Sequence, residues 1–416
     1  IKEKGQLYFL SLITPLVGFV LASLSYFLFK DQVFAFLNAS DLLKENFFYI
    51  ILLVFFIGFY DVLTAISRSY LSAATPIFIN EVFLKFYSMS TLLLHWFGYI
   101  DFTTFLQIYL FGYVLKFVIL FILQLSEGRL TFNFSLKDLD LKEFLKFGFY
   151  VLVGGASIMI VTRLDMMMIA YLLDLEQVAF YTVAFFIGNA IKIPGKSIVT
   201  ISTPLVAKAW EIKDLKEIQT LYTKSSINQL IIGGILFVCI WLNIDDIFSL
   251  LPEKFQVGRW VVFYIGLSQL FSLTAGINGA IIVNSRYYKY DLYTNVILVF
   301  ITIATNYILI PIYGINGAAL ATAISVLLFN LIRLILIEVK MDMQPFSKET
   351  VFTILVLLGI YLILNNMHFM LLPLFAIVIK STLALLIYIL LVIKLNLSED
   401  ISGFVNDLKS RFIKVN

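Results

Sequence analysis

Uninterrupted apolar runs of about 20 residues recur along the whole chain, and they limit its fold more than any other feature. A helix rises 1.5 Å per residue, so a run of about this length crosses the roughly 30 Å hydrocarbon layer of a bilayer. A membrane β-barrel would instead show alternating segments of about ten residues. We expect twelve spanning helices, at 6–29, 47–72, 77–97, 103–125, 147–173, 177–203, 224–250, 257–284, 291–312, 316–338, 350–366 and 371–393.

The charge content agrees with a membrane protein. Only 14% of the residues are charged and 61% are hydrophobic, whereas soluble domains carry about 25% charged residues. The net charge of +3 is too small to indicate a nucleic-acid partner. Cys239, His95 and His368 are too few for a His/Cys metal site, and we expect no metal and no cofactor. The sequence therefore predicts an all-α integral membrane protein.

The basic residues of the loops predict the orientation. If the amino end is cytoplasmic, the outer loops contain only Lys30, Lys44, Lys254 and Arg259, and the inner loops contain the other loop Lys and Arg residues. Cytoplasmic loops are enriched in Lys and Arg. We therefore expect a multi-pass membrane protein with both ends of this chain in the cytoplasm.

An internal repeat indicates two pseudo-symmetric helical lobes. Ser67-Arg68-Ser69-Tyr70 ends one span, and Ser285-Arg286-Tyr287-Tyr288 ends another span 218 positions later. Shifting the first four spans by the same distance places each on a later span, as in transporters built from parallel repeats. The spans at 147–173 and 177–203 have no earlier counterpart, so we expect two further helices before Ile1.

These observations predict the domain organisation. The regions in chain order are the four-helix remainder of an N-terminal lobe at 1–125, a cytoplasmic linker with an interfacial helix at 126–146, a six-helix C-terminal lobe at 147–340, a terminal helix pair at 350–393 and a cytoplasmic tail at 394–416. A second amphipathic stretch at 205–223 is also predicted to lie at the membrane interface.

Polar side chains inside the spans are the candidate site. An ionisable group near the bilayer centre costs at least roughly 2.5–3.5 kcal/mol, so it usually faces a cavity or a partner. The candidate cavity residues are Asp61, Arg68, Lys116, Arg163, Asp165, Asn189 and Lys192.

Not all of these residues can have the same role. Arg163 and Asp165 are two positions apart and point about 160° from each other on a helix. We favour Arg163 toward the cavity and Asp165 toward a neighbouring helix. Arg68 also suits an orientation anchor, and buried pairing of the basic groups with Asp61 or Asp165 is the structural alternative.

Three stretches carry a resemblance to a known family. Pro311-Ile312-Tyr313-Gly314-Ile315-Asn316-Gly317-Ala318-Ala319-Leu320-Ala321-Thr322 matches a P-x-Y-G-x-x-G-A-A-x-A-T turn, Arg163-Leu164-Asp165 is followed by Val178 to Ala184, and the span at 47–72 ends in Arg-x-Tyr. In these features the chain resembles the polysaccharide (Wzx-type) flippases, which handle O-antigen, capsule or exopolysaccharide precursors. Their superfamily (multidrug/oligosaccharidyl-lipid/polysaccharide, MOP) also holds the MATE exporters and the lipid II flippases.

The resemblance implies a transporter and not an enzyme. It implies that an undecaprenyl pyrophosphate-linked oligosaccharide moves from the inner to the outer leaflet for surface polysaccharide (for example lipopolysaccharide) biosynthesis, by alternating access of two lobes. The partners would be this lipid-linked oligosaccharide, membrane lipids and Na⁺ or H⁺. The excess of Lys and Arg among the mid-membrane charges suits a pyrophosphate.

Two other functions stay open. A MATE-type multidrug or cation antiporter would use carboxylates, for which Asp61 and Asp165 are the candidates. A membrane polysaccharide polymerase or ligase would need a catalytic constellation, and the sequence shows no nucleophile, His and carboxylate set.

Overall fold

The computed structural model describes residues 2–36, 41–70, 72, 74–129, 163–367 and 372–403, which are almost entirely helical and contain no strand. Two compact units divide the chain, Ile1–Ser157 (unit 1) and Ile158–Asn416 (unit 2), and each is described separately. The predicted linker beyond residue 129, the first part of the span at 147–173, His368 and the tail beyond residue 403 lie outside the described residues.

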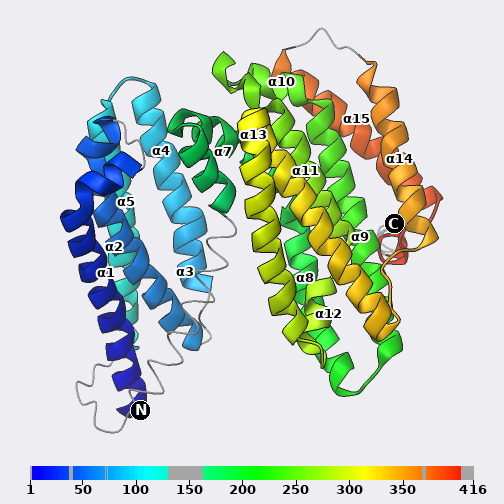
Figure 1. The fold of residues 1–416 in the computed structure, drawn as a ribbon, viewed down its shortest axis with the longest axis horizontal. Helices are drawn as coiled ribbons and strands as arrows, with labels where there is room; N and C mark the ends of the chain where they lie inside the picture. The colour runs from blue at the N-terminus through cyan, green and yellow to red at the C-terminus, as the bar shows by residue number, and fades with distance from the viewer. Residues whose placement is uncertain are drawn as a thin grey trace, which may run out of the picture. The chain divides into compact units, whose positions relative to one another are not determined.

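Unit 1 contains four described spans (Figure 1). They are α1 (Lys2–Phe36), α2 (Asp41–Ser69), the continuous run α3 (Ala74–Phe78), η1 (Ile79–Phe83) and α4 (Leu84–Trp96), and α5 (Phe102–Ser126). The Asp101 side chain caps α5 by accepting a hydrogen bond from the Thr104 backbone at 3.2 Å. Hydrogen bonds with Thr104 lower the pKa of Asp101.

Unit 2 begins, in its described part, with a helix that ends at residue 172. The helices that follow are α7 (Leu175–Asn189), η2 (Ala190–Lys192), α8 (Ile193–Glu211), α9 (Leu215–Leu242), α10 (Ile244–Ser249), η3 (Glu253–Gly258), α11 (Arg259–Thr274), α12 (Asn278–Asn284), α13 (Lys289–Met341), α14 (Lys348–Asn365) and α15 (Pro373–Lys394).

The long apolar helices confirm the predicted all-α membrane fold. Nine helices of the described residues are long and apolar enough to cross a bilayer, and the pair Glu253–Thr274 and Asn278–Asn284, bent by 47°, is a tenth. One of the nine, α13, contains two of the predicted spans. The helix that ends at residue 172 is the last part of the predicted span at 147–173.

A tight turn divides α13 into two antiparallel arms (Figure 1). Gly314 has φ 58° and ψ −138°, a conformation that glycine adopts readily. The Thr305 hydroxyl lies 3.1 Å from the Ser325 hydroxyl, and Arg333 Nε donates to Thr294 Oγ1 at 3.2 Å, so the arms run back along each other. The Pro-Tyr-Gly motif therefore forms a turn, as the sequence predicted.

The span predicted at 177–203 is broken at its centre, where the 3₁₀ turn η2 joins α7 to α8. Gly195, just after the break, is buried, and a Cβ there would lie 2.2 Å from Leu273 Cδ2. The stretch at 205–223, predicted to lie at the membrane interface, does not form a helix of its own. Residues up to Glu211 continue α8, and α9 begins at Leu215, because the apolar face of each helix packs into one shared core around Val206, Ile218 and Tyr222.

The terminal helices α14 and α15 pack against α9. A core cluster joins Ile231 and Val238 of α9 to Leu357 of α14 and Ala384 of α15. Lys380 Nζ of α15 lies 2.8 Å from Asp246 Oδ2 of α10, and both side chains are largely buried. This ion pair gives a structural reason for a lysine in the middle of an apolar helix.

The α13 turn yields a stability prediction. A Cβ at position 317 would lie 2.0 Å from the backbone oxygen of Leu309, which cannot move without disturbing the turn. Overpacking of this kind typically costs about 1–3 kcal/mol. We expect Gly317→Ala to lower the melting temperature of the detergent-purified protein, measured by thermal unfolding.

Gly359→Ala in α14 is the matched control, since a Cβ there meets no atom within 4 Å. Alanine is favoured over glycine inside a helix, so this variant should unfold at or above the temperature of the parent protein. Equal melting temperatures for the two variants would contradict the described turn.

Candidate functional site

Unit 1 holds a lysine inside its helix bundle. Lys116 of α5 is only 3% exposed. Its Nζ donates a hydrogen bond to Asn80 Oδ1 at 3.1 Å and lies 4.3 Å and 4.8 Å from the ring centroids of Tyr60 and Tyr113. Aromatic faces stabilise a cation at such distances. The ammonium group is thus held mainly by neutral partners.

Asn80 is positioned by an irregular piece of helix. It lies in η1, a π-helical turn within the run from α3 to α4. Such π-helical turns are rare and occur frequently at functional sites. Asn80 could not be predicted from the sequence, because a pattern of apolar runs carries no signal for a local change in helical winding.

A hollow of about 640 Å³ surrounds this lysine within unit 1. Its lining comes from α2, η1, α4 and α5, and consists of Ile57, Asp61, Asn80, Leu84, Lys85, Ser88, Met89, Leu92, Phe105, Tyr109, Tyr113 and Lys116. The hydroxyls of Tyr109 and Tyr113 lie 3.0 Å apart. Lys116, Tyr109 and Tyr113, all on α5, thus line one hollow.

Two acidic residues moderate the positive charge of the hollow. Asp61 is exposed and interacts electrostatically with Lys116. Glu81 forms an ion pair with Lys85. The site therefore offers a cation, an amide, hydroxyls and aromatic rings, a set of groups that can hold a phosphate beside a sugar.

Unit 2 holds a carboxylate. Asp165 is partly buried, and its Oδ2 accepts hydrogen bonds from Tyr181 at 2.9 Å and from Thr322 at 2.5 Å, while Oδ1 accepts one from Asn306 Nδ2 at 2.8 Å. Tyr181 belongs to α7, and Asn306 and Thr322 belong to opposite arms of α13. These three donors are neutral, and together they tie three helical segments to the helix that carries Asp165.

One oxygen beside this carboxylate lacks a partner. Asn306 is fully buried, and its Oδ1 accepts no hydrogen bond from the described residues. An unsatisfied buried acceptor typically costs about 1–3 kcal/mol. The Asp165 carboxylate, the Thr322 hydroxyl and this amide oxygen are the oxygen ligands that hard cations prefer.

The other predicted residues differ in position. Arg163 is exposed, with Nη1 3.7 Å from Met166 Sδ. Asn189 is half-buried at the end of α7, and Lys192 is exposed in η2. Arg68 lies in α2, but its side chain is outside the described residues.

The predicted site residues thus fall into two groups. Asp61 and Lys116 line the hollow of unit 1, whereas Asp165, Asn189, Lys192 and Arg163 belong to unit 2.

The fold and the polar centres define a polytopic helical protein with charges held inside its bundles, and comparisons with known proteins agree. Residues 151–308 match the MatE family. The fold is similar to "Lipid II flippase MurJ, inward closed conformation", with TM-score 0.74 and 16% identity over 92% of this chain and 82% of that chain. It is also similar to the Vibrio cholerae MATE transporter VcmN in the bent form, with TM-score 0.50 and 12% identity over 79% of this chain and 77% of that chain.

No curated protein matches the chain in sequence. The likenesses show a fold shared with a lipid flippase and a MATE transporter. The match of residues 151–308 to the MatE family agrees with the superfamily that the sequence motifs indicated.

The Asp165 centre yields a second prediction. Tyr181→Phe removes a donor from a carboxylate, and hydrogen bonds to charged groups contribute about 1.5–3 kcal/mol. Tyr388→Phe is the control, because Tyr388 is equally buried but donates to a backbone oxygen, that of Ile231, at 3.1 Å. A neutral bond of this kind contributes about 0.5–1.5 kcal/mol. Thermal unfolding should show the larger loss for Tyr181→Phe, and the reverse order would contradict the described hydrogen bond from Tyr181 to the Asp165 carboxylate.

Proposed function

We propose that the chain moves an undecaprenyl pyrophosphate-linked oligosaccharide from the inner to the outer leaflet of the bacterial plasma membrane, for surface polysaccharide biosynthesis. The observation that carries this proposal is Lys116, a lysine among aromatic rings beside a hollow of about 640 Å³. Its Nζ donates a hydrogen bond to the neutral Asn80 amide, and it faces the same hollow as Asp61, which interacts with it electrostatically. A pyrophosphate carries the opposite charge and accepts hydrogen bonds from such a group.

The rest of the lining suits a sugar. Tyr109, Tyr113, Ser88 and Asn80 supply hydroxyl and amide groups, and Phe105 supplies an aromatic face. Ligand sites commonly combine apolar walls with a few polar groups that fix orientation. The hollow therefore has the chemistry expected for a phosphorylated sugar headgroup.

Unit 2 contains a hollow of its own with apolar walls. A second hollow of about 360 Å³ lies among α9, α11 and α14, and its lining is almost wholly apolar: Leu230, Gly234, Phe237, Val238, Trp241, Phe263, Leu267, Leu270, Ile354, Leu357, Leu358 and Tyr361. A polyprenyl tail buries apolar surface without any hydrogen-bonding requirement. The walls of this hollow therefore suit an apolar chain.

The Asp165 centre supports coupling to Na⁺ or H⁺. A carboxylate among neutral donors, beside the unpartnered oxygen of Asn306, can accept one monovalent cation or one proton. Binding there would replace hydrogen-bond donors that hold α7 and both arms of α13. Occupation of this centre would thus favour one arrangement of unit 2 over another, as alternating access requires.

A MATE-type multidrug or cation antiporter is the second candidate. The MatE match at residues 151–308 favours it, because this segment contains Asp165. A membrane polysaccharide polymerase or ligase has less support, since both similar structures are named as a flippase or a transporter.

Transport by a Lys116 variant tests the proposal. In proteoliposomes, we would follow the exposure of a labelled undecaprenyl pyrophosphate-linked oligosaccharide to an external glycan-cleaving enzyme. Lys116→Met keeps the length of the side chain but removes its charge, and loss of a charged hydrogen bond of about 1.5–3 kcal/mol corresponds to a decrease of about 10- to 100-fold.

Lys44→Gln is the matched control, because Lys44 also belongs to unit 1 but forms an exposed ion pair with Asp41. It should transport at the parental rate. Efflux of a cationic dye, measured in the same vesicles, separates the two candidates. Dye efflux without exposure of the sugar lipid would reject the flippase and favour the antiporter.

Ion dependence tests the role of Asp165. We expect Asp165→Asn to remove the response of the transport rate to an imposed Na⁺ or H⁺ gradient, because the amide cannot bind either ion as a carboxylate does. Asp246→Asn is the control, since Asp246 is paired with Lys380 in the terminal region. A gradient response that survives in Asp165→Asn would contradict coupling at this centre.

A further inference from the structure

A third hollow, of about 850 Å³, lies at one end of unit 2, where α8, α12 and α13 end and α9 begins. It is lined by Ala207, Trp210, Glu211, Lys213, Leu215, Asn284, Arg286, Tyr287, Val339, Lys340, Met341 and Asp342. The distribution of basic residues places this end at the cytoplasmic face. Neither the substrate site nor the Asp165 centre includes any of these residues.

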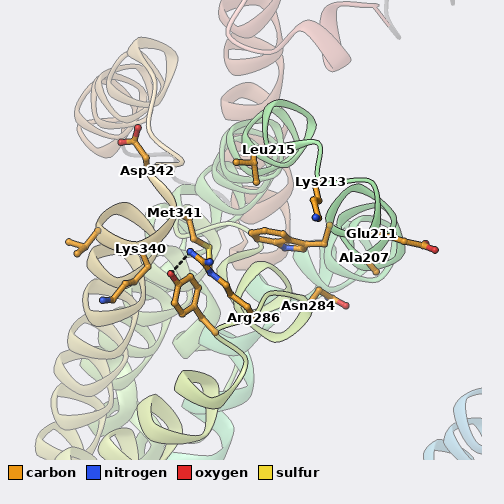
Figure 2. A pocket seen from close by; sticks show the side chains of 12 residues that line it. Ala207, Glu211, Lys213, Leu215, Asn284, Arg286, Lys340, Met341 and Asp342 are labelled. Atoms are coloured by element: carbon orange, nitrogen blue, oxygen red, sulfur yellow. Dashed lines mark hydrogen bonds between the residues drawn. The ribbon is translucent and has the colours of Figure 1, made fainter.

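The charges around this hollow are arranged asymmetrically. Its lining contains three basic residues, Lys213, Arg286 and Lys340, and two acidic ones. Figure 2 shows the ends of Lys213 and Arg286 turned toward the hollow, with Lys340 at its edge, while the carboxylates of Glu211 and Asp342 point away from it. The interior of the hollow is therefore positive.

The basic groups are held in place by local structure. Arg286 donates to Tyr287 Oη at 2.8 Å and lies 4.8 Å from the centroid of that ring. Lys213 has φ 58°, a left-handed conformation that closes the turn between α8 and α9. The guanidinium of Arg286, positioned by Tyr287, can bind two oxygens of one phosphate in parallel.

A free hydrogen-bond donor lies in the same lining. The indole Nε1 of Trp210 is buried and has no acceptor among the described residues. Trp210 packs on the core cluster of Val206, Ile218 and Tyr222, which fixes the ring. The lining thus contains an unsatisfied neutral donor in addition to its cations, a combination that matches an anion with several acceptor oxygens.

The rim of the hollow is apolar and exposed. Val339 is 71% exposed and Leu215 is 49% exposed. In a chain that spans a membrane, such side chains contact acyl chains when they lie at the interface. A headgroup attached to acyl chains suits this rim, whereas free phosphate gains nothing from it.

We propose that this hollow binds the phosphodiester headgroup of an anionic membrane phospholipid. Basic pockets between membrane helices on the cytoplasmic side bind anionic headgroups in this way. Arg286 and Lys213 contact the phosphate oxygens, the Trp210 indole donates to one of them, and Val339 and Leu215 contact the acyl chains. The bound lipid links the ends of α8, α12 and α13.

Lipid binding to the full-length protein tests this proposal independently of transport. Detergent-purified protein is titrated with phosphatidylglycerol or with phosphatidylcholine, and lipid–protein complexes are quantified by native mass spectrometry. The test variant is Lys213→Gln with Arg286→Gln. The control is Lys216→Gln with Lys289→Gln, which removes the same charge from exposed residues that do not line the hollow. Trp210→Phe removes the donor without changing the charge.

We expect the test variant to bind phosphatidylglycerol at least fivefold more weakly than the control, and Trp210→Phe to bind it at least twofold more weakly than the parent protein. Phosphatidylcholine should bind more weakly than phosphatidylglycerol to the parent protein.

Equal phosphatidylglycerol binding by the test variant and the control would overturn the proposal. So would complete displacement of phosphatidylglycerol by millimolar inorganic phosphate, which would identify a free-phosphate site. Equal melting temperatures of the two double variants would show that a binding loss arises at the hollow and not from unfolding.

Discussion

A charged side chain within a bilayer has to find its partners inside the protein, because hydrocarbon supplies no hydrogen bonds. In unit 1, Lys116 is held by the amide of Asn80 and the rings of Tyr60 and Tyr113. In unit 2, Asp165 is held by three neutral donors from other helical segments. Each charge therefore fixes the relative positions of the helices around it, and the packing of each unit depends on the satisfaction of its charge.

Two other largely buried basic residues, both in unit 2, have a carboxylate as their partner. Arg333 pairs with Asp291 and lies over the Phe329 ring, and Lys380 pairs with Asp246. A pair of opposite charges is neutral as a unit and has little attraction left for a ligand. The described hydrogen bonds of Lys116 and Asp165 are with neutral groups, while Asp61 interacts electrostatically with Lys116, and these two residues are the candidates for binding a ligand or ion of opposite charge. This contrast separates the structural charges from the candidate functional ones.

Periodic features of the sequence predicted the parts of the fold that depend on local chain properties. The apolar runs predicted the spans, and the motif with Pro311 and Gly314 predicted the turn of α13. Each of these inferences needs only helical geometry within a short stretch of sequence.

The remaining features depend on contacts between distant residues. Thr322 and Asn306 lie 157 and 141 positions from Asp165, so no local pattern links them to it. Asn80 reaches Lys116 from a π-helical turn, which hydropathy does not reveal. The stretch at 205–223 was predicted as an interfacial element because its polar face is visible in the sequence, whereas its partners in the core around Val206 and Tyr222 are not.

The contacts of Asp165 link the proposed coupling site to the two points of unit 2 where helices are interrupted. Its carboxylate contacts Tyr181 of α7, and α7 leads directly into η2 and α8, where the helix path is broken. It also contacts both arms of α13 across the Gly314 turn. A proton or cation that competes for the carboxylate oxygens changes the hydrogen bonds of all three segments at once. Since a broken helix and a glycine turn deform more easily than continuous helix, these two points are where unit 2 would absorb that change.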